Sequence, residues 1–120
     1  DSVQSQDDPF ILTVDVTSMS ANPNNLIPEV FALHQNYPNP FNPTTKIRYD
    51  LPIESDVNII IYDIMGRQVK YLINKKQNPG YQSIIWDATN DLGQPVSAGM
   101  YIYTIQVGEF MQKRKMILLK

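Results

Sequence analysis

Residue types that perform enzyme chemistry are scarce in this chain. His34 is the only histidine, and there is no cysteine. No spacing of Ser, His and Asp indicates a catalytic triad, and the sequence has no HExxH motif or phosphate-binding glycine loop. The twelve carboxylates are spread over predicted turns, and no pair is placed for acid–base catalysis. The sequence therefore predicts a protein that is not an enzyme and has no cofactor, with His34 as a packed or surface side chain.

One stretch offers oxygen ligands that a metal could use. Asp87, Asn90 and Asp91 lie close together in WDATNDLGQP (86–95). Calcium takes about six to eight oxygen ligands, part of which the backbone can supply. Asp and Asn side chains also stabilise turns by bonding to their own backbone. The turn is the favoured interpretation, and a calcium site is the alternative.

The aromatic residues allow two interpretations. Trp86 is expected in the core, and Tyr101 and Tyr103 alternate along MYIYTIQV (100–107), as on the buried face of a strand. Exposed aromatic rings can also stack on sugars, so Trp86 or Tyr101 could serve a carbohydrate-binding module. Burial is the favoured interpretation.

Charge is unevenly distributed along the 120 residues. The net charge of −2 gives no basic field, which disfavours nucleic-acid binding. Residues 1–40 hold five acidic residues and no Lys or Arg, whereas the last eight residues contain four basic ones, Lys113, Arg114, Lys115 and Lys120. Basic residues near a chain end commonly protect the edge of a sheet. The alternative is a recognition tag.

The ends of the chain carry no membrane signal. No apolar run approaches the roughly 18 residues that a membrane-spanning helix needs. The first residues, DSVQSQDD, do not resemble a signal peptide and are expected to be an internal part of a longer protein.

Short alternating segments dominate the rest of the sequence. Residues 9–17 form one such segment, and a Ser-, Asn- and Pro-rich linker follows at 18–28. Turn signals then separate seven predicted strands, at 31–35, 45–51, 56–64, 68–73, 81–87, 100–107 and 110–120, with a turn at 75–80. This pattern predicts an all-β antiparallel sandwich of about seven strands. We expect the domain to span residues 29–120, with 1–28 as the end of an upstream domain and a linker.

The segment NYPNPFNPTTKIRYDLP (36–52) places several prolines ahead of a strand. Proline cannot donate to a sheet ladder, so these residues are expected in an extended segment that follows a sheet edge ahead of the strand beginning near Thr45. A polyproline-like conformation would make the segment a stiff strap across one end of the sandwich.

Three features together resemble one known family. NYPNPFNPTTKIRYDLP is followed by the hairpin VNIIIYDIMGRQV, then by GYQSIIWDATNDLGQPVSAGMYIYTI, and the chain ends on KRKMILLK. In combination these motifs, over about residues 31–120, resemble the type A C-terminal sorting domain of the bacterial type IX secretion system. The middle portion also resembles the Ig-like domain of the flagellar hook-capping protein.

The resemblance implies an Ig-like β-sandwich that lies at the C-terminus of cargo proteins in Bacteroidota. Such a domain directs its folded cargo from the periplasm through the outer-membrane translocon to the cell surface or the medium. It implies recognition through the start of the strand at Gly99 and Tyr101 and through the segment 113–120, which holds Lys113, Arg114, Lys115 and Lys120. It also implies that the segment made of Tyr37, Pro38, Asn39, Pro40 and Phe41 marks the start of the domain, and that processing acts in the linker at 18–28.

Strand addition is the expected mode of recognition. A terminal strand with an aliphatic run and lysines at its rim could join a partner's sheet, with main-chain bonds providing affinity and the basic residues fixing register. Two other functions are open: an Ig-like structural or docking module of a multidomain extracellular protein, and a carbohydrate-binding module.

Overall fold

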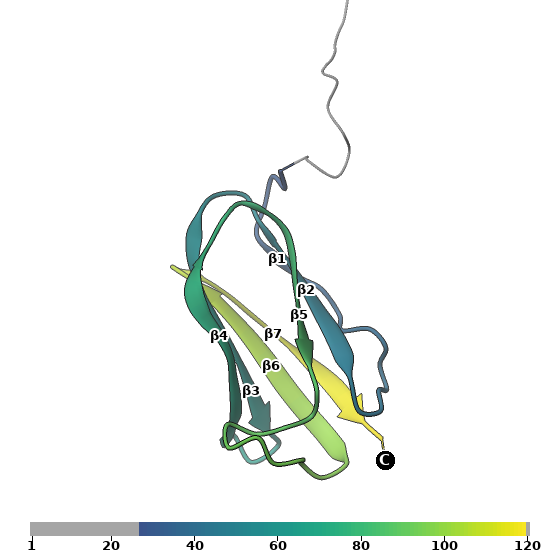
Figure 1. Cartoon of the computed structure of the whole chain (residues 1–120). Helices are drawn as coiled ribbons and strands as arrows, with labels where there is room; N and C mark the ends of the chain where they lie inside the picture. The colour runs from purple at the N-terminus through teal and green to yellow at the C-terminus, as the bar shows by residue number, and fades with distance from the viewer. Residues whose placement is uncertain (1–26, 120) are drawn as a thin grey trace, which may run out of the picture.

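A computed structural model describes residues 27–119, and every regular element in this part of the chain is a strand (Figure 1). The strand-like segment 9–17, most of the linker and Lys120 lie outside the described residues. The strands are β1 (Ala32–Leu33), β2 (Thr45–Leu51), β3 (Ser55–Asp63), β4 (Gln68–Gln77), β5 (Gly80–Trp86), β6 (Gly99–Val107) and β7 (Phe110–Leu118). The prediction of an all-β fold with seven strands is confirmed.

Two antiparallel sheets face each other. The smaller sheet has the order β1-β2-β5, and the larger one has the order β4-β3-β6-β7. The chain therefore alternates between sheets, because β2 and β5 belong to one while β3 and β4, which lie between them in sequence, belong to the other. This is the Ig-like sandwich expected from the strand pattern and the resemblance.

The core follows from strict alternation along the strands. In β2 the side chains of Ile47, Tyr49 and Leu51 are buried, and those of Lys46 and Arg48 are exposed. The inner faces of β3 and β6 are apolar in the same way. Their buried side chains complete the core, and they are Val57, Ile59, Ile61, Tyr103, Ile105 and Val107. Because a strand turns successive side chains to opposite faces, this pattern fixes which face of each sheet is buried.

Two predicted boundaries are wrong. Residues 75–80 were expected to form a turn, but β4 continues to Gln77 and β5 begins at Gly80, so only Asn78 and Pro79 connect them. Continued pairing of Lys75, Lys76 and Gln77 with β3 overrides the polar composition of this stretch. The first strand is also shorter than predicted, since only Ala32 and Leu33 pair with β2.

No helix among residues 27–119 is long and apolar enough to cross a membrane.

Candidate recognition surface

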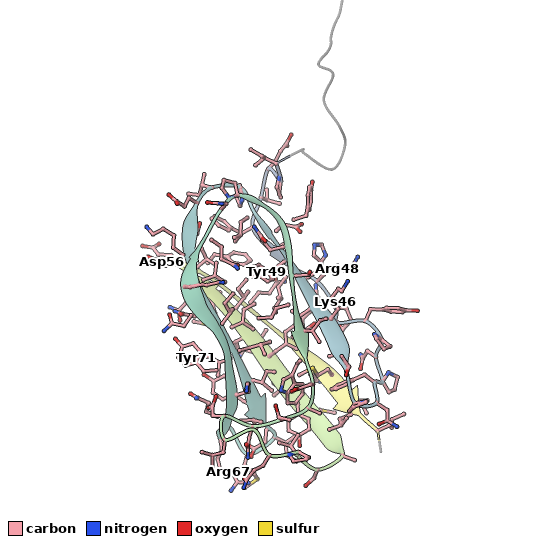
Figure 2. All side chains as sticks on the ribbon, viewed as in Figure 1. Lys46, Arg48, Tyr49, Asp56, Arg67 and Tyr71 are labelled. Carbon is pink, nitrogen blue, oxygen red and sulfur yellow. The ribbon has the colours of Figure 1, made fainter. Side chains whose placement is uncertain are left out.

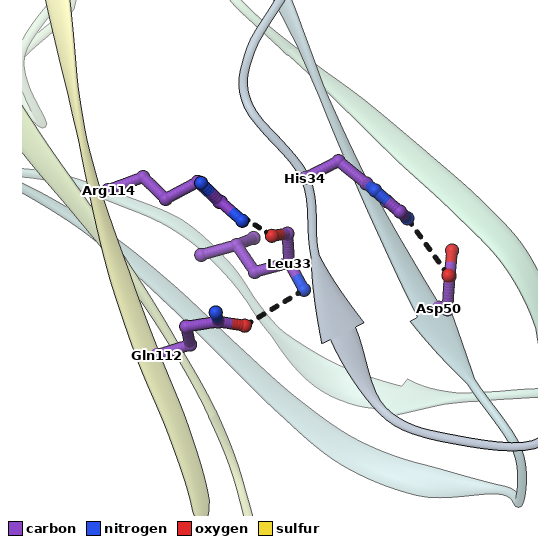
Figure 3. A network of polar contacts seen from close by, with 5 residues as sticks. All are labelled: Leu33, His34, Asp50, Gln112 and Arg114. Atoms are coloured by element: carbon purple, nitrogen blue, oxygen red, sulfur yellow. Dashed lines mark hydrogen bonds and ion pairs between the residues drawn. The ribbon is translucent and has the colours of Figure 1, made fainter.

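The basic residues of β7 divide between two faces. Lys113 and Lys115 are exposed on the outer face of the larger sheet, whereas Gln112 and Arg114 are partly buried on the inner face. Figure 3 shows Gln112 and Arg114 reaching the backbone of Leu33 from β7. The Nε of Arg114 donates to the carbonyl of Leu33 at 2.7 Å, and the Oε1 of Gln112 accepts from the N–H of Leu33 at 3.2 Å. Arg114 therefore joins the two sheets. Of the three basic residues at 113–115, Lys113 and Lys115 are the two that are exposed to a partner.

The outer edge of β7 is closed by residues that precede β2. We call residues 36–43 the proline segment. The N–H of Phe41 donates to the carbonyl of Ile117 at 3.0 Å, and the N–H of Leu119 donates to the carbonyl of Phe41 at 2.8 Å. The side chain of Asn39 accepts from the N–H of Ile117 at 2.9 Å. Addition of this end of β7 to a partner's sheet would first have to displace the proline segment.

The proline segment is held by buried side chains. Phe41 is 1% exposed and packs against Trp86, with ring centroids 5.8 Å apart. Asn36 is also buried, and its N–H donates to the hydroxyl of Tyr103 at 2.8 Å. That hydroxyl in turn donates to the carbonyl of His34 at 2.7 Å, and burial raises the pKa of Tyr103 to about 12. These contacts tie the segment to β5 and β6.

The segment follows a sheet edge as expected, but it is not a polyproline-like strap across one end of the sandwich. Residues 38–40 and 42–43 form bends, and the peptide bonds before Pro38, Pro40 and Pro43 are cis. The segment pairs with β2 through Tyr37 and Lys46, and with β7 through Phe41 and Leu118. It follows the edge where the two sheets meet, because Phe41 and Asn36 are anchored in the core on one side and β7 supplies main-chain groups on the other.

The strand start at Gly99 and Tyr101 presents only one of its two residues. Gly99 is exposed, with a φ of +148°, whereas Tyr101 is 6% exposed. The ring of Tyr101 lies edge-on to Trp86 at 5.4 Å, and its hydroxyl donates to the carbonyl of Ser97 at 2.6 Å. The ring of Tyr101 is therefore buried, and recognition at this strand start, which stays a prediction, would act through Gly99 and the strand backbone and not through that ring. Because Trp86 is fully buried too, neither ring presents a face on which a sugar could stack.

The candidate calcium ligands are engaged in separate hydrogen bonds. One oxygen of Asp91 accepts from the N–H of Tyr71 and the other from the side chain of Gln68, both at 2.8 Å. These bonds hold the pKa of Asp91 below its ordinary value. The side-chain oxygen of Asn90 accepts from two backbone N–H groups of its own loop, and Asp87 accepts from the hydroxyl of Thr89 at 2.6 Å. Within residues 27–119 no three His, Cys, Asp or Glu side chains form a group that could hold a metal ion. The hydrogen bonds fit the turn interpretation.

His34 is paired with a carboxylate on the outer face of the smaller sheet. Its Nε2 lies 2.9 Å from a carboxylate oxygen of Asp50, a residue of β2 (Figure 3). This pair lies on the opposite side of the sandwich from the outer face of β7.

A groove on the outer face of the larger sheet was not predicted. It has a volume of about 480 Å³, and its lining includes Ile60, Tyr62, Ile102, Thr104 and Lys113. The register aligns these residues across the strands, with Ile60 opposite Thr104 and Thr104 opposite Lys113. The sequence contained a signal, because Ile60 and Ile102 are large apolar residues at positions whose alternation points them outward. Lys113 therefore borders a largely apolar groove.

Comparison with known proteins identifies the family. The family model for the secretion system C-terminal sorting domain matches residues 35–119. A search of curated proteins finds no match. Among solved structures, dimeric latent PorU from Porphyromonas gingivalis matches with a TM-score of 0.61 and 24% identity over 79% of this chain. PorZ, a surface component of the type IX secretion system of the same organism, matches with a TM-score of 0.50 and 17% identity over 75% of this chain.

The two structural matches establish likeness of fold, and this chain spans only 10% of PorU and 11% of PorZ. The family model is what establishes the function, because it covers the chain from the residue before the proline segment to the end of β7, which includes every strand except β1. The chain belongs to the secretion system C-terminal sorting domain family, and it is a sorting signal of the type IX secretion system that marks a protein for export to the cell surface or the medium.

Proposed function

We propose that residues 29–120 are a non-catalytic recognition domain and that residues 1–28 connect it to an upstream cargo. Sorting domains of this family are generally non-catalytic. Processing after export, where it occurs, would act in the linker at 18–28.

The secretion machinery is proposed to bind the outer face of β7. The observation that carries this proposal is the separation of the basic residues: Lys113 and Lys115 are exposed, and Arg114 bonds to Leu33. Ile117 and Leu119 continue the same exposed stretch, at 40% and 51% exposure. A face that combines two lysines with an apolar groove suits a partner with carboxylates at the rim of an apolar ridge. Gly99 and Lys120 are proposed as further recognition residues for the same partner.

Deleting residues 113–120 would be an ambiguous test of this surface. The deletion removes Met116 and Leu118, which are fully buried, so it would unfold the sandwich as well as remove the lysines. Substitution of the exposed residues avoids this difficulty. The double variant Lys113→Glu/Lys115→Glu reverses two charges on the outer face and leaves the core intact.

The test is performed on the whole cargo protein in a host with a type IX secretion system. The double variant is expected to remain in the periplasm, while the unmodified protein reaches the surface or the medium. Lys75→Glu/Lys76→Glu is the matched control, because it makes the same charge change at exposed positions of β4. Normal export of the β7 variant, with an unchanged melting temperature, would reject this surface as the recognition site.

A further inference from the structure

The free edge of β5 presents unpaired main-chain groups. The N–H and carbonyl of Lys46 both bond to Tyr37, and the carbonyl of Arg48 accepts from the N–H of His34, so these groups of β2 face away from β5. Ile85 and Ser83 lie opposite Lys46 and Arg48 in the register. In an antiparallel ladder, hydrogen-bonded and non-hydrogen-bonded pairs alternate, so the main-chain groups of Tyr81, Ser83 and Ile85 point away from β2. None of the hydrogen bonds within residues 27–119 satisfies them.

The other three sheet edges are protected. The backbone of Leu33 in β1 is bonded by Gln112 and Arg114, and the edge of β7 is bonded by the proline segment. On the edge of β4, Asp91 accepts from the N–H of Tyr71 and donates its own N–H to the carbonyl of Val69. That strand also carries three lysines, Lys70, Lys75 and Lys76.

By contrast, β5 has the sequence GYQSIIW, without a charged residue or a proline. Charges, prolines and covering loops are the usual means by which proteins prevent pairing at an edge. Tyr81 and Ile85 on this strand are 62% and 57% exposed. The β5 edge is therefore the one among the described strands that is both open and apolar.

A free cation lies beside this edge. Arg48 is opposite Ser83 on the outer face, and Figure 2 shows Lys46 and Arg48 projecting from β2 on the side away from Tyr49. The nearest carboxylate along β2, that of Asp50, is paired with His34 at 2.9 Å. Among the described residues, no ion pair or hydrogen bond engages the side chain of Arg48 or Lys46.

A hollow connects the cation to the edge. It has a volume of about 460 Å³, and its lining includes Arg48, Ser83 and Tyr81. Ser83 is the small side chain between Arg48 and the open edge. A carboxylate on a strand added next to β5 would lie opposite Ser83 and could enter the hollow toward the guanidinium.

We propose that β5 accepts an extended segment of a partner protein, with an acidic side chain opposite Ser83 and apolar side chains opposite Tyr81 and Ile85. Main-chain hydrogen bonds along the edge provide affinity, and the acidic residue fixes register by binding Arg48. The partner sequence on the contacting face is therefore apolar, acidic, apolar at alternate positions. This surface lies on the smaller sheet, away from the lysines of β7. The proposal therefore does not depend on how the secretion machinery recognises the domain.

The test uses the full chain and three short capped peptides of Thr and Val. One has a central Glu, one a central Lys, and the third replaces a residue next to the Glu with Pro. The Glu peptide is expected to bind more tightly than the other two, and Arg48→Glu is expected to weaken its binding about tenfold or more. Arg48→Glu should bind the Lys peptide more tightly than the Glu peptide, because the substitution reverses the sign of the charge that faces the peptide. Lys75→Glu, at an exposed position of β4 on the other sheet, is the matched control and should change neither affinity.

Ser83→Pro tests the edge itself. It removes an N–H that points to the open side and none that bonds β2, so the sandwich should fold and lose binding of the Glu peptide. Equal binding of the Glu and Lys peptides would overturn the proposal. So would a concentration-dependent dimer abolished by Ser83→Pro, since the occupant would then be a second copy. Protection of the Ser83 amide from hydrogen exchange before peptide is added would also overturn it, because the chain itself would then cover the edge.

Discussion

Arg114 donates a hydrogen bond from its Nε to the main-chain carbonyl of Leu33, 2.7 Å away and 81 residues earlier in the chain. The bond joins the larger sheet to the shortest strand of the smaller one at the edge where the two meet (Figure 3). It explains why one of the basic residues near the end of the chain serves the fold while its two neighbours remain exposed.

Replacing Arg114 should destabilise the domain. Arg114→Met removes a charged donor and leaves a partly buried carbonyl without a partner, which costs about 1.5–3 kcal/mol in the free energy of unfolding. Lys113→Met at the adjacent exposed position is the control and should stay within about 0.5 kcal/mol. Urea denaturation of the two variants measures the difference, and equal stabilities would contradict the structural role of Arg114.

Phe41 should be the main attachment of the proline segment. Phe41→Ala removes a fully buried ring that contacts Trp86, and we expect it to cost about 3–5 kcal/mol. Tyr37→Ala, in the same segment but 75% exposed, should cost little. Thermal unfolding followed by tryptophan fluorescence reports both the stability and the environment of Trp86. A small loss for Phe41→Ala would mean that the segment is held mainly by its backbone bonds.

Stability should fall steeply at alkaline pH. Burial raises the pKa of Tyr103 from 10.0 to about 12. Between these values the unfolded chain loses the phenolic proton while the folded chain keeps it, so unfolding is favoured as the pH rises. At about 1.4 kcal/mol for each pKa unit, Tyr103 accounts for a loss of about 2 kcal/mol by pH 12.

Tyr103→Phe is the control for this pH dependence. The variant should be less stable at neutral pH, because it loses the hydrogen bonds to His34 and Asn36, and its stability should change less between pH 10 and 12. Burial also raises the pKa of Tyr49 and Tyr101, so part of the slope should remain. An unchanged slope in Tyr103→Phe would contradict the assignment.

Calcium should have no effect on this domain. The oxygens of Asp91 are already used by Tyr71 and Gln68, so an excess of calcium should leave the melting temperature unchanged. Asp91→Ala should instead speed hydrogen exchange at the amide of Tyr71, which loses its acceptor. A calcium-dependent rise in melting temperature that Asp91→Ala abolishes would restore the metal-site interpretation.

The sequence predicted most of the fold because alternation is a local signal. Ile47, Tyr49 and Leu51 were assigned to one face of their strand, and all three are buried. Trp86 was expected in the core and is there, fully buried. The end of β4 was missed because the Pro79-Gly80 turn signal was taken to include Lys75 and Lys76, whereas pairing with β3 decides the conformation of these two residues.

The candidate site was less predictable because it depends on contacts between distant segments. Alternation places Arg114 on the opposite face of the strand from Lys113 and Lys115, but only the position of Leu33 beside β7 gives Arg114 its partner. The motif containing Tyr101 pointed to recognition, but the packing of its ring on Trp86 makes it a core residue. Likewise, the prolines suggested a strap, and only the bonds from Phe41 to Ile117 and Leu119 reveal that they close the edge of β7.

The central claim is that this domain is sufficient to direct a protein through the type IX secretion system. The most direct measurement fuses residues 18–120 to a fluorescent reporter that carries an inner-membrane signal peptide, and locates the reporter in a host with this system and in its translocon mutant. We predict reporter at the surface or in the medium of the host, and retention in the periplasm of the mutant. Retention in the periplasm of both strains, with the domain folded, would contradict the claim.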